Sequence, residues 1–243
     1  MVRSTLAVLI AMFLFPASAA TVPFVGCPSD GQVGPDPAPR GKPVAIALDP
    51  KIAVHLAFYQ SKYDEGVLAP RGWHCVNLEG SSGWFTIVAR EPVKAEDFIR
   101  RREKPITGPA IQISMNDGGT SGRFEVARLV ARYFPQRRAF LQNVLAEGIE
   151  PASDFPNGGF KTDRIVQRQD DLIEVLTPPY KKGLGTMSRL VPSDLPIHAA
   201  AVVTGSVDDD WGGIIFSVRL ASEQDALAPT VLAWNLRHYR GAK

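Results

Sequence analysis

The two cysteines place the strongest constraint on how this chain can fold. Cys27 lies in "VPFVGCPSDGQ", and Cys75 ends "GVLAPRGWHC". An even pair of cysteines in an exported chain usually forms a disulfide, because compartments outside the cytoplasm are oxidising. Lipid attachment at Cys27 is the alternative, since Gly26 before it loosely fits a lipobox. A lipobox normally follows the apolar run of the signal directly, whereas eleven residues separate Phe15 from Cys27. We therefore expect a Cys27–Cys75 disulfide.

Export is predicted from the first twenty residues. Arg3 precedes an uninterrupted apolar run, Leu6–Phe15, which ends at Pro16 and is followed by small residues as far as Ala20. This order is that of a secretory signal peptide. The run has ten residues, and a membrane-spanning helix needs about 20. We expect residues 1–20 to be removed, no transmembrane segment, and a periplasmic or secreted protein.

The charge balance limits the partners. The chain has 27 Lys and Arg against 25 Asp and Glu, and loss of Arg3 with the signal leaves 26 against 25, a net charge of +1. A near-neutral chain lacks the excess of positive charge typical of nucleic-acid or anionic-membrane binding. We expect the partner to be an envelope component or a small molecule, and not a nucleic acid.

The remaining chain divides into an N-terminal strap and a single domain. Residues 26–43 are dense in Gly and Pro, which excludes a helix. Held by Cys27, residues 21–48 are expected to form an extended strap against a domain at 49–243. Asp49 and Pro50 are typical of a helix start, and apolar residues recur at helical spacing from there to Tyr63.

The other expected elements have no regular alternation. The hydrophobic patterns predict helices at 94–102, 123–134, 137–147 and 230–239, and strands at 73–78, 84–89, 110–115, 172–177, 197–205 and 214–220. Such a mixture favours an α+β fold with a mixed, mainly antiparallel sheet and several packed helices.

No catalytic signature is present. The chain lacks G-x-S-x-G. His74, His198, Asp117 and Ser121 are the candidates for a small secreted hydrolase with an unusual site. Two of these side chains within hydrogen-bond reach in one cleft would favour that hypothesis, and scattered positions would favour a binding or envelope-support protein. The sequence favours the second and leaves open whether any catalysis occurs.

Metal and cofactor motifs are also missing. No two histidines stand three or four residues apart, and there is no H-E-x-x-H or C-x-x-C. Asp208–Asp210 lack the alternating acids and distant Glu of a calcium loop. We expect no metal and no cofactor.

Two segments are candidate binding sites. In "NDGGTSGR" a strand leads through glycines to a helix start, where free backbone N–H groups can hold an anion. The anion-binding candidates are Gly118, Gly119, Thr120, Ser121 and Arg123. An ordinary strand-to-helix turn is the alternative. Arg71, Trp73 and His74 form the second candidate, because Trp and Arg are enriched at binding hot spots. The alternative there is that Trp73 covers the disulfide.

The segments that hold the two cysteines resemble a known family. "VPFVGCPSDGQ" and "GVLAPRGWHC", with weaker similarity at "GLGT" (183–186) and "VRLAS" (218–222), resemble a family of secreted proteobacterial proteins of uncharacterised function. The resemblance implies a bacterial envelope location and a shared disulfide. It implies no catalytic residue.

Overall fold

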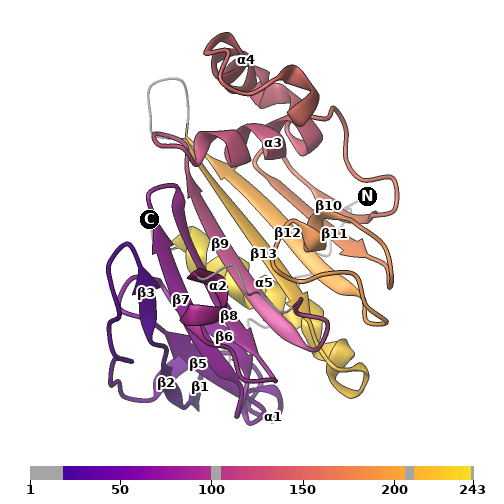
Figure 1. The fold of residues 1–243 in the computed structure, drawn as a ribbon. Coiled ribbons are helices and arrows are strands. Elements are labelled where there is room, and N and C mark those ends of the chain that lie inside the picture. The colour runs from indigo at the N-terminus through magenta and orange to yellow at the C-terminus, as the bar shows by residue number, and fades with distance from the viewer. Residues whose placement is uncertain (1–18, 100–104, 206–210, 242–243) are drawn as a thin grey trace, which may run out of the picture.

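A computed structural model describes residues 19–99, 105–205 and 211–241 (Figure 1). Residues 1–18, which make up most of the expected signal peptide, and the acidic turn at 208–210 lie outside the described residues. Among the helices that are described, none is long and apolar enough to cross a membrane.

The centre of the fold is an eight-stranded sheet with the order β10-β11-β12-β13-β9-β8-β7-β3. Neighbouring strands are antiparallel except for β3 and β7, which are parallel. With the helices described below, this sheet confirms the expected α+β class. Its strands are β3 (Ser29–Gly31), β7 (His74–Gly80), β8 (Gly83–Ala89), β9 (Ala110–Asp117), β10 (Arg164–Arg168), β11 (Leu172–Thr177), β12 (Ile197–Thr204) and β13 (Gly212–Arg219).

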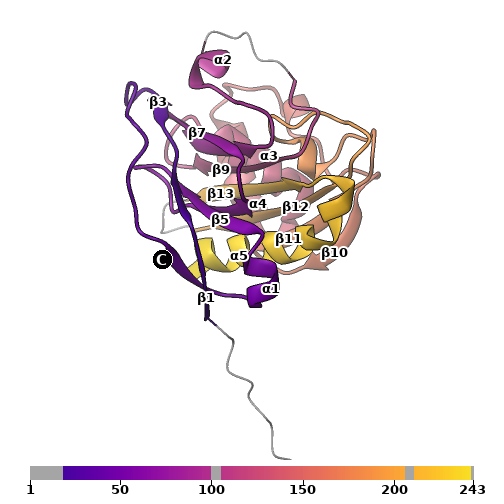
Figure 2. The ribbon, with the colours of Figure 1, turned by 90° about the horizontal axis from the view of Figure 1, so that it is seen from below.

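Each face of the sheet carries its own core. α3 (Arg123–Tyr133) and α4 (Arg138–Ala146) lie at one end of the first face, and α5 (Ala228–Gly241) crosses the other (Figures 1 and 2). Strand alternation assigns the side chains: Ile111 and Ile113 of β9 join the core under α5, whereas Ala110 joins the core under α3. The smaller elements are α1 (Pro50–Ala53), α2 (Ala95–Ile99) and the 3-10 turns η1 (Pro135–Arg137), η2 (Ala152–Asp154), η3 (Leu184–Thr186) and η4 (Ser222–Leu227).

The N-terminal segment forms strands in three sheets. β1 (Ala19–Val22) pairs with β4 (Val44–Ala47), and β2 (Phe24–Gly26) pairs with β5 (Leu56–Gln60), which pairs with β6 (Val67–Pro70). β3 extends the large sheet beside β7. The expected disulfide is present and joins Cys27, between β2 and β3, to Cys75 on β7.

One helix prediction is wrong. Asp49 caps a helix as expected, its Oδ1 accepting from the backbone N–H of Lys51 at 2.8 Å, but this helix ends at Ala53. The residues that follow form β5. Four consecutive residues of β5, Leu56–Tyr59, are buried because the strand is covered on both faces, and a run of this kind has no strand alternation to reveal it. The spacing of apolar residues as far as Tyr63 was therefore not that of a helix face.

Other predicted elements agree with the structure to within a few residues. The strands that became β7, β8, β9, β11, β12 and β13 are present, as are α3, α4 and α5. The expected helix at 94–102 is described only as α2, because residues 100–104 lie outside the described ranges. The sequence missed the short strands β1–β4, the buried strands β5 and β6, and the exposed edge strand β10.

A buried asparagine of α5 completes the free edge of β6. Asn235 accepts from the Leu68 N–H at 2.9 Å and donates to the Leu68 carbonyl at 3.0 Å, as a neighbouring strand would. We expect Asn235→Ala to lower the free energy of unfolding by about 2 kcal/mol, because a buried N–H and a buried C=O lose their partners. Urea denaturation of this variant beside Asn143→Ala, an exposed site in α4, checks this. Equal effects in the two variants would contradict it.

Candidate functional site

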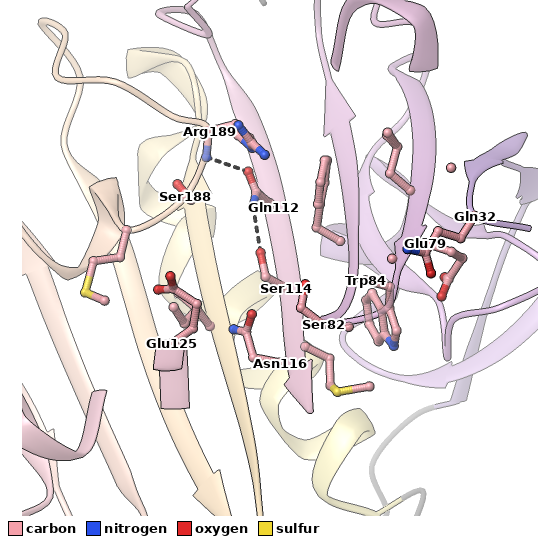
Figure 3. A pocket seen from close by; sticks show the side chains of 18 of the residues that line it. Gln32, Glu79, Ser82, Trp84, Gln112, Ser114, Asn116, Glu125, Ser188 and Arg189 are labelled. Atoms are coloured by element: carbon pink, nitrogen blue, oxygen red, sulfur yellow. Dashed lines mark hydrogen bonds between the residues drawn. The ribbon is translucent and has the colours of Figure 1, made fainter. Parts of the chain in front are cut away.

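A groove of about 670 Å³ lies on the α3 side of the large sheet. Its floor is made by β9 with its neighbours β8 and β13, and its sides by the segment after η3 and by the tip of the β7–β8 hairpin (Figure 3). Residues from the strap, Gly31 and Gln32, border it at the far rim. Several segments that are distant in the sequence thus meet around one open cavity.

The floor carries a row of uncharged polar side chains. Gln112, Ser114 and Asn116 are alternate residues of β9 and therefore share one face (Figure 3). Gln112 is 3% exposed; its Oε1 accepts from the backbone N–H of Arg189 at 2.7 Å, and its Nε2 donates to Ser114 Oγ at 2.7 Å. The Gln112 amide is therefore held in one orientation. Because Ser114 Oγ accepts from Gln112, the hydroxyl hydrogen of Ser114 is left for another acceptor.

Asn116 has no side chain directly beside it on either adjacent strand. Its partners across the two adjacent strands are both glycines, Gly83 on β8 and Gly213 on β13. Its side-chain amide forms no hydrogen bond with another of the described residues. By contrast, Ser114 lies between Phe85 and Ile215, so apolar surface flanks the row there.

The side of the groove near Arg189 depends on two glycines in the "GLGT" segment. A Cβ on Gly183 would lie 2.0 Å from Oδ1 of Asp163, and one on Gly185 would lie 2.6 Å from Cγ2 of Ile197. Asp163 in turn accepts from the Leu184 N–H at 2.8 Å. The close packing of η3 therefore needs glycine at both positions, and it sets the path of the chain into the groove wall.

The opposite side depends on the strap. The backbone N–H of Gln32 donates to the carbonyl of Glu79 at 3.0 Å, which places Gln32 on the rim of the groove (Figure 3). The side chains of Glu79 and its cross-strand partner Trp84 take the other face of the hairpin, where Trp84 lies against Tyr239 at 5.9 Å between ring centroids. Burial raises the pKa of the Glu79 carboxyl above its usual range.

Three buried polar side chains are joined by hydrogen bonds on the face of the β7–β8 hairpin that lies away from the groove. Asn77 donates to Thr86 Oγ1 at 3.1 Å, and the Thr86 hydroxyl donates to Asp64. Asp64 also accepts from the backbone N–H groups of Ser61 and Gly66. Burial raises the pKa of Asp64, and these hydrogen bonds partly offset the increase. These hydrogen bonds have a structural role, because they join the loop that carries Asp64 to both strands of the hairpin.

The four candidate hydrolase residues are scattered. His74 is exposed on β7, and Ser121 is exposed in the loop before α3. His198 lies on the α5 face, 3.6 Å from Asp225, and burial lowers its pKa. Asp117 ends β9, where its Oδ1 accepts from the Gly119 N–H at 2.8 Å. Among the described residues, no hydrogen bond or ion pair joins any two of the four.

The polar groups of the candidate anion loop bind mainly within the protein. The Arg123 guanidinium contacts the Glu147 carboxylate at 2.7 and 2.9 Å and the Thr120 carbonyl at 2.8 Å. The N–H groups of Gly118, Gly119 and Thr120 bond to Trp211 and Asp117. Anion binding at this loop stays a prediction, and these contacts give it no further support.

Arg71 and Trp73 are tied to the body of the protein. Arg71 Nε donates to the Leu56 carbonyl at 2.8 Å, and the Trp73 backbone N–H donates to the Tyr59 hydroxyl at 3.0 Å. The Trp73 ring packs against the core that contains Cys27. Their use as a binding surface also stays a prediction.

The sequence did not identify the floor residues. The signal was present, because polar Gln112, Ser114 and Asn116 alternate with apolar residues in "QISMN". Alternation of this kind is typical of any strand with one solvated face, so it does not distinguish a groove from open surface. In the described part of the chain, no group of three or more His, Cys, Asp or Glu side chains is placed to hold a metal ion.

Comparisons of the chain with protein-family models, with curated proteins and with solved structures find no match.

Proposed function

We propose that this is an exported, periplasmic or secreted binding protein that holds a small polar ligand in the groove over β9. The row Gln112, Ser114 and Asn116 carries the proposal. Gln112 is buried and held at both ends of its amide, so it fixes the Ser114 hydroxyl beside the open Asn116 amide. Binding to groups that are already ordered costs less conformational entropy. A groove with a few placed polar groups among apolar ones is the usual form of a ligand site.

Export is supported by the disulfide and by the resemblance to secreted proteobacterial proteins. The Cys27–Cys75 bridge is compatible with an extracellular or periplasmic location. The apolar N-terminal run, with Arg3 before it, supports the same location.

The groove chemistry favours binding over catalysis. Ser114 Oγ is paired with the amide of Gln112, which cannot accept a proton as a general base. Glu125, at the edge of the groove, is paired with Arg128 at 2.5 Å. None of the candidate hydrolase residues lines the groove. The hydrolase hypothesis therefore has no contact among the described residues in its favour.

Asn116→Leu tests the proposed function. Leucine keeps a similar size, fits between the flanking glycines and removes the open amide. We expect screening of amino acids, amines, sugars and capped peptides by ligand-detected NMR to find a class that the wild type binds and that Asn116→Leu binds at least about tenfold more weakly. Gln142→Leu, at an exposed site in α4, is the control. Binding that survives Asn116→Leu, or no binding by any class, would overturn the proposal.

A further inference from the structure

The spacing of the floor row indicates what kind of ligand fits it. Ser114 and Asn116 are two residues apart on one strand, which is about 6.6 to 6.8 Å of rise. The carbonyl and N–H groups on one side of any extended peptide recur with the same period, because they also repeat every two residues. A peptide that lies extended along β9 would meet Ser114 and Asn116 with successive backbone groups.

The hydrogen-bonding character of the two residues matches a peptide backbone. The Ser114 hydroxyl accepts from Gln112, so it is a donor toward the groove and suits a carbonyl. The Asn116 side chain has one acceptor oxygen and an NH₂ donor, which complement the N–H and C=O that one residue of an extended peptide presents on one side. It can therefore form two parallel hydrogen bonds with the backbone groups of a single peptide residue. This protein already contains such a pairing, because Asn235 binds both backbone groups of Leu68.

The surroundings of the row fit the side chains of such a peptide. Phe85 and Ile215 flank Ser114, and Leu78 and Met187 also line the groove, so apolar contacts are present on both sides. Gly83 and Gly213 beside Asn116 leave space for a backbone to approach. The floor row itself carries no charge, which favours an uncharged segment over a strongly acidic or basic one.

We propose that the groove binds an extended, uncharged peptide segment along β9, with its backbone bonded to Ser114 and Asn116. This inference rests on the proposed function and names its ligand class. Recognition through the backbone makes binding tolerant of peptide sequence, because most of the polar contacts are to groups that every residue shares.

An ester analogue gives the test. The probes are N-acetyl-tetra-alanine amide, versions of it in which one amide N–H at a time is replaced by an ester oxygen, and maltotriose as a neutral sugar. Binding to the full, disulfide-bonded protein is measured by NMR titration. We expect one ester to bind about tenfold more weakly than the peptide, and Asn116→Leu to bind the peptide about tenfold more weakly. The Asn116→Leu variant should bind this ester almost as tightly as it binds the peptide, because the hydrogen bond that the ester removes is already absent from the variant.

The outcomes separate this inference from the proposed function. If maltotriose binds, the peptide does not, and Asn116→Leu abolishes the sugar binding, the peptide inference is wrong and the groove remains a ligand site. If every ester binds as tightly as the peptide, backbone recognition at Asn116 is wrong. If no probe and no class in the wider screen binds, both proposals fail. The ester series needs only the wild type, so a folding defect in a variant does not affect it.

Discussion

Replacement of both cysteines, Cys27→Ala with Cys75→Ala, is expected to lower the free energy of unfolding by about 4 kcal/mol. The bridge closes a loop with a sequence separation of 48 residues, and the chain-entropy model gives a value of about this size for such a loop. Cys27 is fully buried, and its backbone N–H donates to the Gln60 carbonyl at 2.8 Å, so the bridge pins the strap where β2 meets β5. The same link holds β3 and Gln32 at the rim of the groove.

Guanidinium denaturation of the double variant and of the wild type, each with and without dithiothreitol, provides the measurement. Reduction should bring the wild type to the stability of the variant and should leave the variant unchanged. An unchanged denaturation midpoint in the double variant would show that the strap is held without the bridge. Because the strap forms one rim of the groove, peptide affinity should also fall in the reduced wild type.

Arg219→Met is expected to cost about 3 kcal/mol of stability. Arg219 is fully buried on β13, and its guanidinium donates to the backbone carbonyls of Gly108 at 2.9 Å, of Val191 at 2.7 Å and of Ile106. Burial lowers the pKa of Arg219 to about 10, so the side chain is charged at neutral pH. Methionine fills much of the space and leaves the three carbonyls without this donor.

The comparison for Arg219→Met is Arg90→Met. Arg90 and Glu223 are both exposed, and 3.6 Å separates the paired atoms, so loss of this ion pair should cost little stability. Urea denaturation of both variants distinguishes the two sites, and similar small effects would contradict the structural role of Arg219. The segment at 190–191 that Arg219 holds follows directly after Arg189, whose N–H orients Gln112. Weaker ligand binding in the folded Arg219→Met protein is therefore also expected.

Much of the fold could be predicted because its signals are local. The β7–β8 hairpin, the amphipathic pattern of α3 and the Asp49 cap are each encoded within a few neighbouring residues. β5 could not be predicted in the same way. Its buried run is compatible with a helix or a strand, and the choice depends on pairing with β2 and β6, which lie along its two edges.

The groove, by contrast, is formed by segments that lie far apart in the sequence. Its floor comes from β9, one wall from the segment after η3, another from the hairpin tip and the rim from the strap. No window of the sequence contains more than one of these parts, and the residues on the floor are ordinary for a half-solvated strand. The anion loop, by contrast, has a conspicuous local pattern, and its polar groups bind mainly to the protein itself.

The sequence by itself determined the Cys27–Cys75 bridge, the α+β class and most of the long elements. These follow from pairing of the two cysteines and from periodic burial, which act on neighbouring residues or on one pair. Only the tertiary structure decided that β5 is a strand, that Asn235 completes the edge of β6, and that Ser114 and Asn116 face a groove. Each of these depends on which distant segments exclude water from a given side chain, and local spacing does not contain that information.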